Sequence, residues 1–281
     1  MIRTVNTDDI VKTIKEMCIE ANHYLSKDMD KALKDATASE KSELGKKILN
    51  QLQENLKIAA EEMIPICQDT GMAVIFLEVG QDVHFEGMAI EDAVNEGVRQ
   101  GYTEGYLRKS VVGDPIIREN TKDNTPAVIH YSIVPGNKVK ITLAPKGFGS
   151  ENMSRVFMLK PADGIEGVKN AILTAVKDAG PNACPPMVVG VGVGGTFEKC
   201  AILAKKALTR PVGEHSAIPY VRELEEEMLT KINQLGIGPG GLGGTTTALD
   251  VNINTYATHI AGLPVAVNIC CHVNRHVIRE V

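Results

Sequence analysis

The first part of the chain carries apolar residues at helical spacing. Between residues 7 and 24 the apolar positions recur every three or four residues: Ile10, Val11, Ile14, Met17, Cys18 and Ala21. A second run of this kind covers residues 29–63, with charged residues between its leucines and alanines, and Pro65 ends it. This run is long for one helix, so the pattern predicts two helices that are separated near residues 37–39.

After residue 65 the pattern changes to short apolar or alternating runs between helical segments. The short runs predict strands at 73–79, 127–134, 138–144, 187–193, 248–256 and 264–269. Helical spacing returns at 90–107, 164–179, 197–208 and 219–235. Pro135, Gly136 and Asn137 lie between two of the strands, and this turn composition predicts that 127–134 and 138–144 pair as a hairpin.

The order of these elements indicates an α/β fold, with mixed β-sheets surrounded by helices and an N-terminal helical region at 1–63. No internal repeat, low-complexity segment or clear linker interrupts the chain. We therefore expect a single domain over residues 1–281, in which residues 64–281 carry the functional site.

Composition and charge narrow the class of protein. No apolar run among the 281 residues reaches the length of a membrane span. The net charge of −5 argues against a protein that binds nucleic acid. The first residues contain neither an apolar signal segment nor a cleavage site, so we expect a cytoplasmic protein whose six cysteines are reduced thiols.

Four loops combine glycine or proline with reactive side chains, and such loops line sites on rigid scaffolds. They cover residues 65–71, 144–152, 179–186 and 270–272. Cys67, Cys184 and one of the adjacent Cys270 and Cys271 lie in or beside these loops, whereas Cys18 and Cys200 have the spacing of core residues.

The loop cysteines leave several interpretations open. Three thiolates brought together by folding would suit a metal ion or an iron–sulfur cluster. Their separations of 117 and 87 residues are not a local ligand spacing, so unrelated cysteines are the simpler interpretation from spacing alone. A cysteine nucleophile with His272 as its base is a further alternative, but neighbours on a strand point to opposite faces, which weakens it.

Two glycine-rich segments resemble nucleotide-binding loops only superficially. Residues 190–195 satisfy G-x-G-x-x-G, but no second strand ending in an acidic residue follows, so a tight strand-to-helix turn explains them better than NAD binding. Residues 236–244 lack the lysine of a phosphate-binding loop, so ATP is not expected. Their backbone N–H groups could instead face an anionic ligand or a cluster.

A few charged side chains near these loops are candidate ligand contacts. Arg108 follows a helix and could clamp a carboxylate, and Asp69 beside Cys67 could orient a ligand. Lys109, Lys146 and Arg275 are each expected to be solvated surface charges, as such residues usually are. His259 precedes Cys271 by twelve residues and could return to the same pocket.

Several motifs together resemble one family in order and spacing. They are Cys-Gln-Asp-Thr-Gly at 67–71, Lys-Gly-Phe-Gly-Ser-Glu-Asn at 146–152, Ala-Gly-Pro-Asn-Ala-Cys-Pro-Pro at 179–186, Gly-Val-Gly-Val-Gly-Gly-Thr at 190–196, Gly-Pro-Gly-Gly-Leu-Gly-Gly at 238–244 and Thr-His-Ile-Ala-Gly-Leu-Pro-Val-Ala-Val-Asn at 258–268. This set, over about residues 65–276, resembles the α subunit of the iron–sulfur hydro-lyases, namely class I fumarase, L-tartrate dehydratase and related mesaconate-hydrating enzymes.

The resemblance implies a [4Fe–4S] cluster held by Cys67, Cys184 and Cys271, with one iron open to substrate. It implies that Gln68, Asp69, Arg108 and Gly149 bind a dicarboxylate and that His259 and Asp69 take part in catalysis. An open iron would act as a Lewis acid on the substrate.

The resemblance also implies the partners and the substrate class. A separate β subunit would complete the site, in an α2β2 enzyme. The substrate expected is fumarate, hydrated reversibly to (S)-malate, with L-tartrate and mesaconate as alternatives. An NAD-binding dehydrogenase domain and a non-catalytic scaffold for the β subunit are remoter alternatives.

Overall fold

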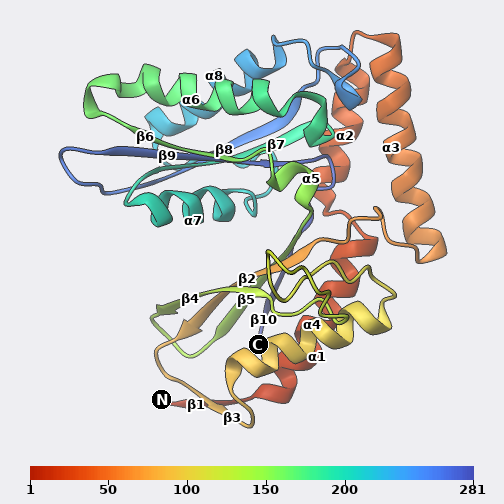
Figure 1. The fold of residues 1–281 in the computed structure, drawn as a ribbon, viewed down its shortest axis with the longest axis vertical. Helices are drawn as coiled ribbons and strands as arrows, with labels where there is room; N and C mark the ends of the chain where they lie inside the picture. The colour runs from red at the N-terminus through yellow and green to blue at the C-terminus, as the bar shows by residue number, and fades with distance from the viewer. The chain divides into compact units, whose positions relative to one another are not determined.

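The computed structural model describes all residues from Met1 to Val281, and they form two compact units (Figure 1). The first unit consists of Met1–Ser26, Leu56–Phe148 and Arg275–Val281. The second unit consists of Lys27–Asn55 and Gly149–Asn274. The interpretation as a single domain stays a prediction. The α/β class with mixed sheets and an N-terminal helical region is confirmed.

The helices follow the predicted periodicity closely. The observed elements are α1 (Thr7–His23), α2 (Lys27–Ser39), α3 (Glu43–Glu62), α4 (Ile90–Glu104), α6 (Gly164–Ala179), α7 (Phe197–Ala207) and α8 (Pro219–Asn233), with a single turn α5 (Phe148–Glu151). The predicted break in the second helical run occurs at residues 40–42. None of these helices is both long and apolar enough to cross a membrane.

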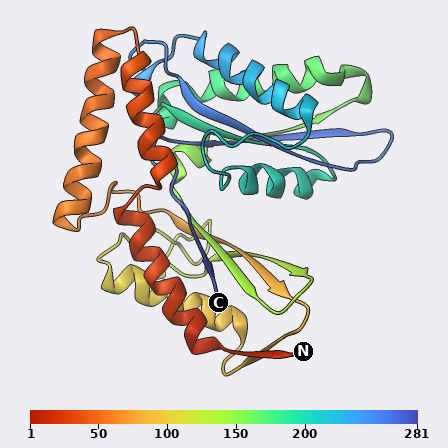
Figure 2. The same ribbon diagram turned by 180° about the vertical axis from the view of Figure 1, so that it is seen from behind.

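The first unit contains a four-stranded mixed sheet and a small parallel pair. The sheet has the order β10 (Val277–Glu280), β5 (Val139–Lys146), β2 (Met72–Gly80) and β4 (Val128–Val134), and β1 (Arg3–Asn6) pairs with β3 (Val83–Glu86). Helices α1 and α4 lie side by side (Figure 2), and Ile10 and Ile14 of α1 share a buried core with Ile75, Leu77 and Leu143. The chain returns to this unit for its last strand, β10.

The predicted hairpin between residues 127–134 and 138–144 is wrong. Both segments are strands, but β2 lies between them, parallel to β4 and antiparallel to β5. Because β2 is the most apolar of the three and is buried along almost its whole length, the central position removes most apolar surface from water. The connecting turn crosses the end of β2 at Gly80, where a Cβ atom would lie only 2.5 Å from the carbonyl oxygen of Gly136.

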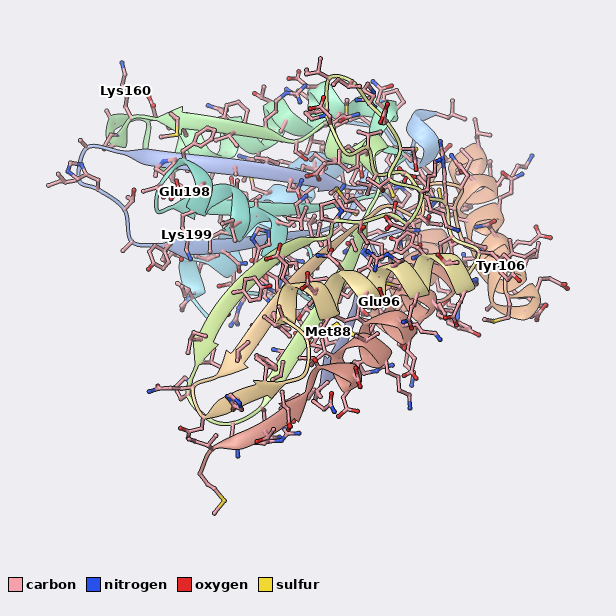
Figure 3. The ribbon with its side chains drawn as sticks, turned by 60° about the horizontal axis from the view of Figure 1, so that its bottom comes forward. Met88, Glu96, Tyr106, Lys160, Glu198 and Lys199 are labelled. Carbon is pink, nitrogen blue, oxygen red and sulfur yellow. The ribbon has the colours of Figure 1, made fainter.

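The second unit is a three-layer arrangement around a four-stranded mixed sheet. The strand order is β6 (Arg155–Leu159), β9 (Leu263–Cys270), β7 (Met187–Gly194) and β8 (Ala248–Tyr256). Helices α6 and α8 cover one face and α7 covers the other (Figure 1). On α7, Glu198 is exposed and the half-buried Lys199 places its Nζ 4.7 Å from the centre of the Tyr256 ring (Figure 3), whereas Cys200, Ala204 and Ala207 are buried.

The glycines at 190–195 serve packing. Gly190 and Gly192 lie within β7, directly under α7, and Cβ atoms there would lie 2.3 Å from the Ala204 oxygen and 2.0 Å from the Cys200 oxygen. The absence of a side chain therefore lets the helix backbone approach the strand. Only Gly194 and Gly195, both with positive φ, form the turn that leads to α7. This arrangement favours the turn interpretation over a dinucleotide site.

Candidate functional site

The loop of residues 67–71 follows α3 and precedes β2 in the first unit. Cys67 is half-buried, its Sγ–H donates to Oε1 of the exposed Gln68 (3.3 Å), and its Sγ accepts from the Asp69 N–H (3.4 Å). Cys67, Gln68 and Asp69 are thus brought together with the thiol accessible.

Asp69 organises this loop through both carboxylate oxygens. Oδ1 accepts from the Gly71 N–H (3.0 Å) and Oδ2 from the Phe148 N–H (2.8 Å). The buried Tyr102 hydroxyl lies within hydrogen-bond distance of the carbonyl oxygens of Thr70 (2.8 Å) and Gly71 (3.0 Å), which fixes the loop from below. The loop conformation is therefore defined by the protein alone, before any ligand binds.

Arg108 lies beside the same loop. The Thr70 hydroxyl donates to the Arg108 carbonyl oxygen (3.1 Å), which fastens the segment after α4 to the loop. The Arg108 side chain is exposed, as is Tyr106, which lies beyond the C-terminal end of α4 (Figure 3). An exposed guanidinium on a segment fastened to this loop can bind a carboxylate.

In the second unit the structure brings Cys184 and Cys271 to one end of the sheet. Cys184 follows a short 3-10 turn (Gly180–Ala183), has a left-handed backbone with φ of 50°, and is exposed. Its carbonyl oxygen accepts from the His272 backbone N–H (3.4 Å) and from His272 Nδ1 (3.0 Å). Because His272 follows Cys271 directly, these bonds join the two loops that carry the thiols.

The glycine-rich segment at 236–244 supports the Cys184 loop with its own backbone. The Gly240 N–H donates to the Pro185 carbonyl oxygen (2.9 Å), and the Gly243 N–H donates to Ile237 (2.9 Å). The Gly238 N–H donates to the Thr247 hydroxyl (3.2 Å). These N–H groups already donate to acceptors within the protein, so they are not available to an external anion as predicted.

The residues that follow this segment, Thr245 and Thr246, bind an anion of the protein itself, the carboxylate of Glu40. The backbone N–H groups of Thr245 and Thr246 donate to it (2.8 Å each), as do those of Lys41 and Ser42 at the corner between α2 and α3. Burial alone would raise the pKa of this carboxyl, but the hydrogen bonds outweigh burial and hold the pKa of Glu40 at about 2.

We expect Glu40→Gln to lower the free energy of unfolding at pH 7 by about 3 kcal/mol, the value of a pKa shift of this size in a buried group. Because the folded pKa lies below the unfolded one, the stabilisation is complete above pH 4.5 and is lost as the pH falls towards 2. Urea unfolding from pH 7 to pH 2 measures this. Glu43→Gln, on the exposed side of α3, is the matched control, and a difference that stays constant over the pH range would contradict the prediction.

Gly149 and His259 have different positions in the second unit. Gly149 lies in α5, where a Cβ atom would be 4.0 Å from the Asn182 carbonyl oxygen, so it neighbours the Cys184 loop. His259 is exposed in the connection between β8 and β9, next to the end where Gly194 pairs with Tyr256. The cysteines lie at the other end, where Cys270 pairs with Val188. The length of the strands separates the two by roughly 25 Å.

Exposure divides the six cysteines into two groups. Cys18, Cys200 and Cys270 are buried, whereas Cys67, Cys184 and Cys271 are accessible. Burial raises the pKa of the Cys18 and Cys200 thiols, which disfavours the thiolate that binds a metal. The accessible group coincides with the three residues that the resemblance implies as cluster ligands, and it separates Cys271 from Cys270.

The chemistry of the accessible thiols fits an iron–sulfur cluster, because thiolates are the ligands that such clusters take. No three His, Cys, Asp or Glu side chains gather in a way that could hold a single metal ion.

Two basic residues that the sequence assigned to the solvated surface are buried. Lys146 is 4% exposed and Arg275 is 3% exposed. Lys146 ends β5 and its Nζ donates to the Gly147 carbonyl oxygen (3.1 Å), while Arg275 donates to the carbonyl oxygen of Asp69. The surface interpretation of both is wrong, because each side chain folds inward against the 67–71 and 146–148 segments. The sequence signal that could have found them is their position inside the motif region.

A family model described as fumarate hydratase (fumerase) matches residues 11–280. The chain therefore belongs to the fumarate hydratase and tartrate dehydratase family of hydro-lyases.

Relatives narrow the assignment within the family. The chain is 44% identical, over 97% of both chains, to a Methanocaldococcus jannaschii protein named "Putative L(+)-tartrate dehydratase subunit alpha". It is 32% identical to the L(+)-tartrate dehydratase subunit alpha of Escherichia coli strain UTI89, over 98% of this chain and 85% of the relative, and 31% identical to that of strain K12. The chain is the α subunit of a hydro-lyase.

Proposed function

We propose that this chain is the cluster-binding α subunit of a [4Fe–4S] hydro-lyase that hydrates fumarate reversibly to (S)-malate. The observation that carries the proposal is the division of the cysteines, because only Cys67, Cys184 and Cys271 are accessible and each lies in a loop fixed by its own hydrogen bonds. A bound cluster with an open iron would supply a Lewis acid for the substrate hydroxyl and one carboxylate.

The chain's own residues would bind and orient the substrate. Arg108 presents an exposed guanidinium that can pair with a carboxylate, and Gln68 presents an exposed amide beside Cys67. Gly149, with no side chain next to the Cys184 loop, would let a substrate approach the backbone. Asp69 would hold the loop and, with His259, serve proton transfer.

A second candidate substrate is L(+)-tartrate, which the names of the relatives favour. Both candidates are four-carbon dicarboxylates, so Arg108 and Gln68 would meet the same carboxylate chemistry. The decisive experiment is an anaerobic assay of the reconstituted α–β complex against fumarate, L-tartrate and mesaconate. A kcat/KM for fumarate at least tenfold above the others supports the first candidate, and the reverse order for tartrate supports the second. A complex that binds no iron and converts none of the three refutes the proposal.

The proposed assembly includes a β subunit and a second copy of each chain, as α2β2. The designation of the relatives as α subunits supports the partner. Accessible thiols and an oxygen-sensitive cluster need reducing surroundings, which supports the cytoplasm as the location.

The position of His259 defines how it could take part. Since one copy holds His259 and the thiols of Cys184 and Cys271 at opposite ends of a sheet, a role in the same reaction requires His259 of a second copy. We expect His259→Ala and Cys184→Ser each to lower kcat by about 100-fold or more. Mixed complexes of the two variants, purified through different tags, should recover about half the wild-type activity, because one site has both residues. A mixed complex as inactive as its parents would exclude this arrangement.

A further inference from the structure

Arg275 is a buried cation with little to neutralise it. The residue lies between β9 and β10, is 3% exposed, and donates from Nη2 to the carbonyl oxygen of Asp69. Its Nε and Nη1 atoms are buried and have no hydrogen-bond partner. No carboxylate forms an ion pair with it.

Such a guanidinium is unfavourable for the fold by itself. An unpaired buried charge costs several kcal/mol, and proteins normally supply a partner of opposite charge. The nearest acidic group on this loop, the Asp69 carboxylate, uses its oxygens to accept from the backbone of Gly71 and Phe148. A second cation, Lys146 at the end of β5, is also buried in this unit.

The Arg275 guanidinium contacts the loop that carries Cys67. The carbonyl oxygen held by Arg275 belongs to Asp69, whose N–H in turn donates to Cys67 Sγ (3.4 Å). The Tyr102 hydroxyl lies within hydrogen-bond distance of the next two carbonyl oxygens, those of Thr70 and Gly71, and it interacts electrostatically with Arg275. An anion bound at this loop would therefore meet a positive charge already in place, without reorganisation of the protein.

We propose that Arg275 is a positioning residue that provides the counter-charge for the anionic cluster and dicarboxylate at the 67–71 loop. This inference rests on the proposed function. Thiolates and substrate carboxylates together carry more negative charge than the cluster core offsets, and Arg275 lowers the cost of collecting that charge. Arg275 acts through the Asp69 carbonyl and through its field, and it does not touch the substrate.

The test compares Arg275→Met, Arg275→Lys and Arg279→Met in the α–β complex. Arg279 is the matched control, because it lies four residues further on, is exposed, and forms a surface ion pair with Glu20. Three quantities are measured for each: the unfolding temperature without iron, the iron bound after anaerobic reconstitution, and the Kd for fumarate and for L-tartrate from the cluster absorbance.

Removal of the charge should separate stability from binding. Arg275→Met should keep or raise the unfolding temperature of the iron-free complex, because an unpaired charge is gone, yet weaken dicarboxylate binding at least tenfold and bind less iron. Arg275→Lys should bind within threefold of wild type, and Arg279→Met should match wild type. A residue that only supports the fold would lose stability and binding together.

Two results would overturn the inference. One is an Arg275→Met complex with wild-type iron content and dicarboxylate Kd. The other is an iron-free Arg275→Met complex that unfolds early, with no recovery of binding in Arg275→Lys. A wild-type complex that takes up no iron refutes the proposed function as well, whereas a wild type that binds iron normally beside an unaffected Arg275→Met refutes this inference alone.

Discussion

Cys184→Ser is expected to abolish iron retention and to lower the activity of the reconstituted complex by more than about 100-fold, since a hydroxyl is a poor replacement for a thiolate ligand. Cys67→Ser and Cys271→Ser should have the same effect. All three thiols are accessible. Hydrogen bonds between groups other than the thiols, such as that from the Gly71 N–H to Asp69 and that from the His272 N–H to the Cys184 carbonyl oxygen, hold their loops. Iron content per complex and the visible absorbance of the cluster, both after anaerobic reconstitution, measure the loss.

The neighbouring Cys270 provides a stringent control. It is 4% exposed, lies in β9 opposite Val188, and differs from Cys271 by one position along the chain. Cys270→Ala should therefore keep the cluster and lose only a modest amount of stability. Full iron content in the Cys271→Ser complex, together with loss in Cys270→Ala, would exchange the roles of the two residues and contradict the assignment.

Gly192→Ala should be among the most destabilising substitutions in the second unit. The added methyl group would lie 2.0 Å from the Cys200 carbonyl oxygen and 2.7 Å from the Ala204 nitrogen, both backbone atoms of α7. Helix and strand must then separate, at a cost of about 3 kcal/mol. For a protein of this size that cost lowers the unfolding temperature by roughly 6–12 °C.

Gly262→Ala is the control in the same unit. A Cβ atom there has its nearest neighbours at 3.9 Å, which is ordinary contact, so the unfolding temperature should change little. Differential scanning calorimetry of the iron-free complex compares the two variants. Equal unfolding temperatures would show that β7 and α7 are not packed as closely as the structure has them.

Periodicity predicted the long elements because their apolar faces are continuous. Each helix from α1 to α8 that has two or more turns coincides with a predicted one, and β2, β7, β8 and β9 lie where apolar runs occur. The short strands β1, β3, β6 and β10 were missed, because a run of four or five residues is too short for its pattern to stand out in the sequence. The predicted pairing of β4 with β5 is wrong for a different reason. The turn residues between them favour a hairpin, but burial of the apolar β2 between the two strands outweighs that local preference.

Local motifs located the loops of the candidate site, and only the fold shows how these loops are distributed. The sequence identified the loops of Cys67, Cys184 and Cys271 from their composition, and the structure adds that His272 joins two of them. Burial of Arg275 and Lys146 could not be read from their residue types, which are usually exposed. The position of His259 at the far end of a sheet depends on strand direction, which a single sequence does not give.

The Asp69–Arg275 contact joins residues that are 206 positions apart. At a synthesis rate of 5–20 residues per second, the ribosome needs roughly 10 to 40 seconds to pass from one to the other. During that interval Arg275 and strand β10 have not yet been synthesised, so the Cys67 thiol is made long before the residues that complete its unit. The proposed cluster would meet an unfinished loop if it were loaded during translation, so this topology favours loading after synthesis.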